Sequence, residues 1–202
     1  MIYSSVHNTE WYMLWQQLVQ KRATTDVHVF VEGVKAPDAP KKARGVHLHC
    51  LDDTEVYGWV ALFWVVQLIH ENKRTEAQNV WDERVLPTLH LQSKRCPKKE
   101  SLVAEIQQRW VSIPRPKEWT LEVEQNYSTA VETFCTLPSP DKCRTLLKNT
   151  INQDLRNGLW VEMVRKFQPA PCVLLVGNDH VGPLWRLFST KLQMMSSISE
   201  FS

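Results

Sequence analysis

The sequence lacks the marks of nucleic-acid-binding and membrane-spanning proteins. Its 202 residues carry a formal net charge of only +2. Basic residues are interspersed with acidic ones along the chain, and the largest basic cluster is in residues 94–99. Without a basic stripe and aromatic platforms, we expect no binding to nucleic acid. The longest apolar run, Trp59 to Leu68, is interrupted by Gln67. It is too short to cross a bilayer core of about 30 Å, so we expect a buried helix there and no association with a membrane.

Paired cysteines and a leader peptide are also missing. The five cysteines are an odd number with no CxxC spacing, which argues against a disulfide framework and a structural zinc site. The first residues, MIYSSVHNTEW, contain no basic region followed by an apolar core, so we expect no targeting segment. These absences favour a reduced, cytoplasmic setting, and a secreted mature chain is the alternative.

What is present is typical of a folded globular protein. Hydrophobic residues make up 43% of the chain and charged residues 23%, and nine tryptophans bring a large area that can be buried. A chain of this length is enough for one domain with a single core. We therefore expect one soluble α/β domain over residues 1–202, with a helical insertion at about 75–140.

The first part of the chain alternates strands with helices. Residues 26–32, DVHVFVE, are rich in β-branched residues and predict a strand. Residues 1–6 and 46–51 predict two more. The first strand is followed by a helix over about residues 8–22, whose apolar side chains recur at the spacing of one helical face. Residues 52–54 can cap a second helix.

The rest of the chain is helical apart from one buried strand. Residues 172–177, CVLLVG, form a continuous apolar run bounded by proline and glycine, which is typical of a central parallel strand covered on both faces. A closing helix is expected to begin near Gly182 and Pro183. Helical spacing between proline breaks predicts the remaining helices at 75–86, 100–110, about 117–136 and after Pro140.

This order of elements predicts a small, mostly parallel sheet flanked by helices, with a helical insertion before the last strand. Such sheets bind ligands outside the carboxyl ends of their strands. We therefore expect a site at this edge of the sheet. Polar, titratable residues follow every expected strand: His7, Glu32, Asp52 and Asp53, and then Asn178, Asp179 and His180.

Two of the expected strands carry histidines, and the alternation of side chains decides on which face each one lies. Alternation puts His28, Phe30 and Glu32 on one face of the second strand and its three valines on the other. His47 and His49 form an HxH pair whose rings point to one face of the third strand. A metal pair has this spacing, but exposed strand histidines are the commoner interpretation.

Other catalytic arrangements have less support. No serine lies in a GxSxG motif. The turn after residues 172–177 lacks the second glycine and the Lys-Ser/Thr of a P-loop. Cys143 and Cys172 have no evident base partner, so nucleophilic thiol chemistry is a minor option.

The order of four motifs resembles a known superfamily. The chain has His7 after its first strand in SSVHNTEW, Glu32 at the end of the second, Arg156 in NQDLRNGLW on a late helix, and GNDH, residues 177–180, after the last strand. This pattern is similar to that of the superfamily that groups erythromycin esterase, ChaN, TraB and the TIKI proteases. The chain departs from the pattern at Ser4, where the superfamily has glycine.

The resemblance implies a hydrolase of ester or amide bonds that acts on a small-molecule or peptide substrate in a strand-end cleft. His7 would then activate water as a general base, oriented by Glu32. Arg156 would stabilise developing oxyanion charge or fix an anionic substrate. His180 would position the leaving group or serve as the acid.

Two alternatives remain for the same residues. Two histidines and a carboxylate can hold a divalent metal around an open water position, which would make His7, Glu32 and His180 its ligands. A non-catalytic protein could instead keep the site for haem, as ChaN does, for another ligand, or for a protein partner. A cofactor is not fixed by the sequence.

Overall fold

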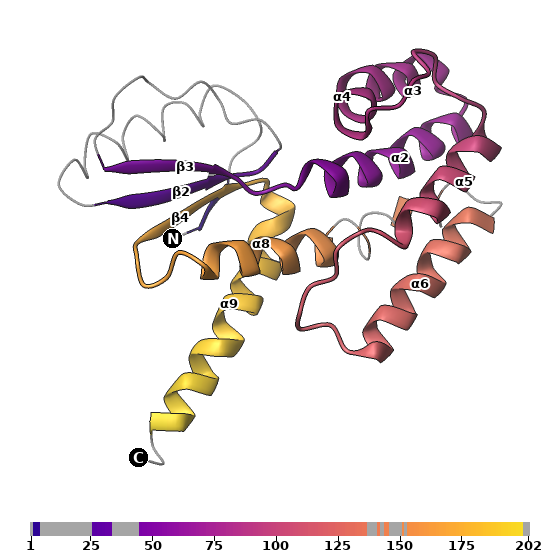
Figure 1. Ribbon diagram of the computed structural model, residues 1–202. Coiled ribbons are helices and arrows are strands. Elements are labelled where there is room, and N and C mark those ends of the chain that lie inside the picture. Colours follow the sequence, from indigo (N-terminus) through magenta and orange to yellow (C-terminus); the bar gives the residue numbers. More distant parts are fainter. Residues whose placement is uncertain are drawn as a thin grey trace. The chain divides into compact units, whose positions relative to one another are not determined.

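The chain divides into two compact units. The computed structural model describes residues 2–4, 26–33, 45–136, 141, 144–145, 151 and 153–199 (Figure 1). We call Met1–Asp52 together with Asn157–Ser202 the sheet unit, and Asp53–Arg156 the helical unit. The helical unit is longer at both ends than the expected insertion at 75–140, and a single domain over residues 1–202 stays a prediction.

The sheet unit contains a parallel sheet of four strands in the order β1-β4-β2-β3, which confirms the expected α/β fold. The strand that comes last in the sequence lies between two others, as its continuous apolar run indicates. The bounds are β1, Ile2–Ser4; β2, Val27–Val31; β3, Val46–Cys50; and β4, Cys172–Val176.

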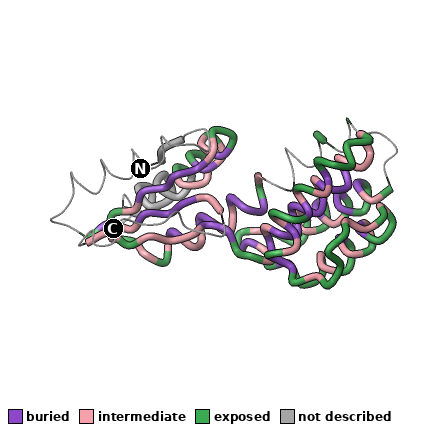
Figure 2. Tube along the Cα trace, turned by 90° about the horizontal axis from the view of Figure 1, so that it is seen from above, coloured by how far each residue is buried: buried purple, intermediate pink, exposed green. Residues whose placement is uncertain are grey.

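Both faces of β2 and β4 are mostly apolar, and buried positions follow one another along these strands apart from the half-buried His28 and Cys172 (Figure 2). One face packs against α8 (Arg156–Arg165) and the start of α9 (Asn178–Ser199). The core between this face and the two helices is formed by Phe30, Leu174 and Val176 of the strands, Trp160, Val161 and Val164 of α8, and Leu184 of α9. The opposite face contains Val27, Val29, Val31, Val173 and Leu175, so the predicted alternation along β2 is confirmed.

The longest apolar run of the sequence forms the central helix of the helical unit. This helix, α2, spans Thr54–His70 and is buried along most of its length, as expected. The Asp53 carboxylate begins it by accepting hydrogen bonds from the backbone N–H groups of Glu55 at 2.8 Å and Val56 at 3.1 Å. The indole of Trp59 donates to the carbonyl of Ile106 at 3.0 Å, which ties α2 to a neighbouring helix.

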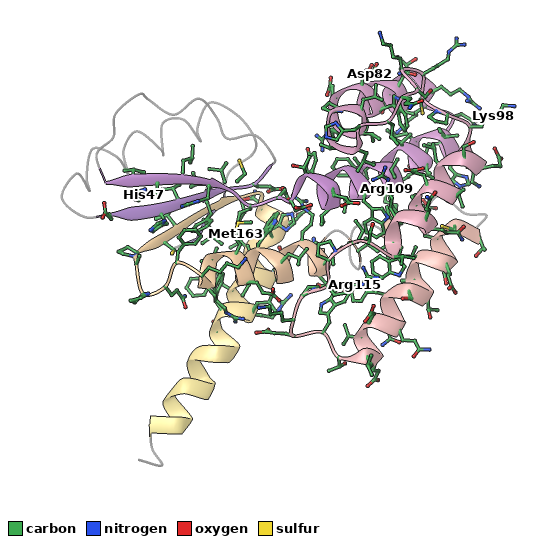
Figure 3. The ribbon with its side chains drawn as sticks, viewed as in Figure 1. His47, Asp82, Lys98, Arg109, Arg115 and Met163 are labelled. Atoms are coloured by element: carbon green, nitrogen blue, oxygen red, sulfur yellow. The ribbon has the colours of Figure 1, made fainter. Side chains whose placement is uncertain are left out.

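Shorter helices surround α2. They are α3, Arg74–Val80; the π-helical segment η1, Trp81–Val85; α4, Leu86–Leu89; α5, Lys99–Trp110; and α6, Leu121–Thr136. On α5, the guanidinium of Arg109 lies 2.5 Å from Oε1 of Glu105 and 3.6 Å from Oε1 of Glu55 (Figure 3). The guanidinium of Arg115 lies over the ring of Trp110. No helix in the described ranges is long and apolar enough to cross a membrane.

Two helix boundaries differ from the predictions, and both involve proline. The helix expected to stop before Pro87 continues to Leu89, because Pro87 lies at the start of α4, where its missing N–H costs little. The closing helix begins at Asn178, before the expected start near Gly182 and Pro183. The expected helix over residues 8–22, His7 and Cys143 lie outside the described residues.

Candidate functional site

Glu32 extends β2 by one residue and turns its side chain toward the end of β4. Its backbone N–H donates to the carbonyl of Leu175 at 3.0 Å, which continues the ladder between the two strands. The carboxylate is 10% exposed, and its Oε2 accepts a hydrogen bond from the backbone N–H of Gly177 at 2.7 Å. Gly33 then adopts a φ of +118°, which glycine tolerates best. The strand end thus fixes Glu32 in one position.

His180 lies in the first turn of α9 and is buried. Its backbone N–H donates to the carbonyl of Gly177 at 3.0 Å, so the chain turns directly from β4 into the helix. The imidazole Nε2 lies 3.6 Å from Oε1 of Glu32, and the two side chains are 7% and 10% exposed. The structure therefore brings together two of the four predicted catalytic residues.

Asn157 contacts His180 from the other side. Its Oδ1 lies 2.8 Å from Nδ1 of His180, and the residue is fully buried on α8. Its Nδ2 has no hydrogen-bond partner among the residues that the structure describes. A buried amide donor without an acceptor is uncommon in folded proteins, because burial removes the water that would otherwise satisfy it.

A second buried carboxylate lies at the end of β3. Asp52 is 6% exposed, and its Oδ2 accepts from the backbone N–H of Gly33 at 2.8 Å. Its Oδ1 accepts from the indole N–H of Trp160 at 3.0 Å. The ring of Trp160 also packs against the ring of His180 at a centroid distance of 4.7 Å. Trp160 therefore links the carboxylate at the end of β3 to the histidine that follows β4.

Arg156 belongs to the helical unit, whereas Glu32 and His180 belong to the sheet unit. It is 5% exposed, and its guanidinium carbon lies 5.8 Å from the ring centroid of Tyr57. The catalytic role expected for Arg156 stays a prediction. So does that of His7, which lies outside the described residues.

The other polar residues expected at the strand ends have different positions. Asn178 and Asp179 are exposed in the first turn of α9, and Asp53 caps α2 in the helical unit. Sequence reasoning did not select Asn157 or Trp160 as site residues. Asn157 stands beside Arg156 in the motif that suggested the superfamily, and this was the only signal for it.

The chemistry of these groups is that of proton transfer and hydrogen bonding. In the described part of the chain, no group of three or more His, Cys, Asp and Glu residues is arranged to hold a metal. The proposed metal set includes His7, so metal binding by it stays a prediction. Burial raises the pKa of the Cys172 thiol, which keeps it protonated at neutral pH and makes it a poor nucleophile.

No protein-family model, no curated protein and no solved structure matches this chain. The resemblance to the erythromycin esterase, ChaN and TraB superfamily accordingly stays a prediction. The candidate site rests on the geometry of the sheet unit itself.

Proposed function

We propose that the protein hydrolyses an ester or amide bond at the carboxyl ends of β2 and β4, with His180 as the proton-transfer group. The observation that carries the proposal is the buried pair of His180 and Glu32, with Nε2 and Oε1 3.6 Å apart. A histidine beside a carboxylate is the usual arrangement for general acid–base chemistry near neutral pH.

The surroundings of His180 suit the role of general acid. Oxygen acceptors lie near both ring nitrogens, Oδ1 of Asn157 beside Nδ1 and Oε1 of Glu32 beside Nε2. Two acceptors around one ring can accept hydrogen bonds from both N–H groups of an imidazolium, the form that the role of general acid requires. His180 would give a proton to the leaving oxygen or nitrogen as the scissile bond breaks, and the attacking water would lose its proton to a separate general base, the role that the sequence predicts for His7.

The separation of 3.6 Å between Nε2 and Oε1 matters for this role. It is longer than a hydrogen bond, so Glu32 attracts the imidazolium without holding the Nε2 proton in a short contact. The second oxygen of Glu32 accepts a hydrogen bond from the backbone N–H of Gly177, which fixes that side of the carboxylate. The Nε2 proton thus stays transferable to a substrate atom.

Asn157 is the second element of the proposed mechanism. Its Nδ2 is a buried donor with no partner in the described part of the chain, beside the imidazole that transfers the proton. A preorganised donor of this kind stabilises the negative oxygen that forms when water attacks a carbonyl group. Asn157 is fully buried, so the substrate carbonyl would supply the acceptor that Nδ2 lacks only after local opening uncovers this side chain.

The proposal is tested with a panel of small chromogenic esters and anilides. We expect the wild-type protein to hydrolyse at least one of them, and His180→Gln to lower kcat/KM by about 10²-fold or more, the usual contribution of an acid–base group. His90→Asn is the matched control, because His90 is exposed and its left-handed φ of +52° is one that asparagine tolerates.

The control variant is expected to retain the wild-type rate, and thermal unfolding of both variants establishes that they are folded. Equal activity of folded His180→Gln and wild type would contradict the proposal. So would the absence of turnover with every substrate in the panel while a ligand still binds at this site, which would support a non-catalytic binding protein.

A further inference from the structure

Three histidines gather on one face of the sheet, away from the candidate site. His28 of β2 pairs in register with His47 of β3, and Phe30 pairs with His49, so all three imidazoles lie on the same face. Ring centroids are 4.9 Å apart for His28 and His47 and 5.2 Å apart for His28 and His49. We call these three residues the histidine cluster. His47 is labelled on β3 in Figure 3.

A direct contact joins two members of the cluster. Nδ1 of His28 lies 2.9 Å from Nε2 of His49, which is a hydrogen-bond distance between two imidazoles. Both rings are half-buried, whereas the side chain of His47 is 51% exposed. Phe167, in the turn after α8, covers the pair with centroid distances of 4.6 Å to His28 and 4.5 Å to His49. Water therefore has limited access to the contact.

Among the described residues, little negative charge lies near the histidine cluster to compensate added protons. Asp26 lies 3.6 Å from Nε2 of His47, and its side chain is 76% exposed, so solvent weakens this attraction. Cys172 of β4 is in register with His28, and burial raises the pKa of its thiol, which keeps it neutral. Lys166, in the turn that carries Phe167, is exposed. Arg165, the last residue of α8, donates a hydrogen bond to the carbonyl of Leu187 on α9 at 3.4 Å.

Successive protons affect the cluster differently. In the neutral state, one of the two facing nitrogens donates and the other accepts. One added proton is compatible with the contact, because an imidazolium can donate to a neutral imidazole. A second proton makes both facing nitrogens donors at 2.9 Å and places two like charges on half-buried rings. Burial, and then the charges of His28 and His47, lower the pKa of His49 below its usual 6.5.

The strain of double protonation would act on the pairing of β2 with β3. In the described sheet, β3 is an edge strand whose neighbour is β2, and it carries two of the three histidines. Its opposite face offers weak support, because Val46 and Leu48 are only partly buried. An edge strand held by one ladder opens more easily than a central strand.

We propose that the histidine cluster is a pH-sensitive latch, which holds β3 against β2 at neutral pH and loosens this pairing in mildly acidic solution. We favour a proton over a metal ion as the ligand of the cluster, because the three rings are stacked and do not direct their nitrogens to one point. Among the described residues, no group of three or more His, Cys, Asp and Glu is arranged to hold a metal. The latch is independent of the proposed hydrolysis and can be tested without any substrate.

The sign of the effect follows from linkage. In the unfolded or opened chain His49 has the usual histidine pKa of 6.5, and in the closed cluster its pKa is lower. The latch therefore contributes fully above about pH 6.5, and its contribution falls as the pH drops through the lowered pKa of His49.

Hydrogen–deuterium exchange of the whole chain tests the proposal. It compares samples at about pH 7.5 and about pH 5.5, on either side of ordinary histidine titration, after correction for the intrinsic pH dependence of exchange. We expect the protection of residues 46–50 to fall about tenfold at the lower pH, while that of residues 172–176 changes much less. His49→Gln should retain most of its protection at the lower pH, and the control His90→Asn should behave like wild type.

Equal protection of residues 46–50 at both pH values in the wild-type protein would overturn the proposal, as would the same fall in His49→Gln. Should His49→Gln not fold, His47→Gln replaces it, because this side chain is half exposed and its removal still takes one charge from the cluster. Zinc ions are also added at about pH 7.5. If they raise the protection of residues 46–50 in the wild-type protein but not in His47→Gln, the cluster is a metal site, and the proposed latch is overturned.

Discussion

Trp160 joins two strand ends of the sheet unit, because its indole N–H donates to Asp52 at 3.0 Å while its ring packs 4.7 Å from that of His180. One side chain of α8 thereby satisfies a buried carboxylate and supports the histidine proposed to transfer the proton. The positions of Asp52 and His180 are coupled through it, so changes at Trp160 should affect both stability and activity.

Replacing Trp160 with phenylalanine should destabilise the sheet unit. The variant removes the donor to Oδ1 of Asp52 and leaves a buried carboxylate with fewer partners, which costs about 1–3 kcal/mol. Urea unfolding followed by a probe in the sheet unit measures the change. Trp185→Phe is the control, because Trp185 is 56% exposed, and its effect should stay within about 0.5 kcal/mol. Equal stability of both variants would contradict the role assigned to Trp160.

Asn157→Ala should lower the rate of hydrolysis with little change in KM. No described residue accepts a hydrogen bond from its Nδ2, so we expect this bond to form with the developing oxyanion. Loss of one such donor typically reduces kcat by about 10²–10³-fold. Steady-state kinetics test this, with Asn79→Ala as the control at an exposed position. A large rise in KM at unchanged kcat would instead assign Asn157 to substrate binding.

The sheet was predictable from the sequence because its strands are short, apolar and bounded by breaks. The central position of residues 172–177 followed from the lack of alternation, and the opposite faces of β2 followed from its presence. Glu32 and His180 were predicted as strand-end residues, and the structure brings them together. Local patterns were sufficient where each element determines its own conformation.

The partners of these residues could not be predicted, because they depend on contacts between segments far apart in the sequence. No local pattern marks Trp160, and only its position beside Arg156 marks Asn157, since an asparagine and a tryptophan on a helix have many ordinary uses. The HxH pair was visible, but the addition of His28 required the register of β2 against β3. Strand register is fixed by the packing of whole faces, and a single sequence does not give it.

Gly58→Ala should destabilise the helical unit although alanine favours helices. A Cβ at Gly58 would lie 2.7 Å from side-chain atoms of Leu89 and also collide with Thr88, whose hydroxyl is held by the carbonyls of Arg84 and Val85. Such overpacking costs about 1–3 kcal/mol beyond the gain in helix propensity.

Thermal or urea unfolding measures the effect, and Gly182→Ala is the matched control. Gly182 also lies in a helix, but no described atom beyond its chain neighbours and its own helix backbone lies within 4 Å of a Cβ placed there. This variant should be neutral or more stable by up to about 1 kcal/mol. The same change for both glycines would contradict the close packing at Gly58.

Glu71 should make the helical unit sensitive to strong acid. Hydrogen bonds from Lys73, Gln67 and Arg144 lower the pKa of its carboxyl to about 2 from the usual 4.5. Because the folded pKa lies below the unfolded one, the contribution of Glu71 is present above pH 4.5 and is lost as the pH falls toward 2.

Chemical unfolding as a function of pH tests this expectation. The stability of Glu71→Gln should fall less than that of wild type over this range, while Glu83→Gln, a change at an exposed glutamate, should follow wild type. If the free energy of unfolding of wild type and of Glu71→Gln changed equally with pH, the three partners would not lower the pKa of Glu71, and the expectation would be wrong.

The central claim is that the carboxylate of Glu32 makes His180 an effective proton-transfer group. The most direct test is the ratio of kcat/KM for Glu32→Gln and wild type on the best ester of the panel. Glutamine keeps the shape and can still accept from Gly177, but it removes the charge beside Nε2. We predict a loss of about 10²-fold or more for folded Glu32→Gln and none for Glu83→Gln. Wild-type activity in folded Glu32→Gln would contradict the account.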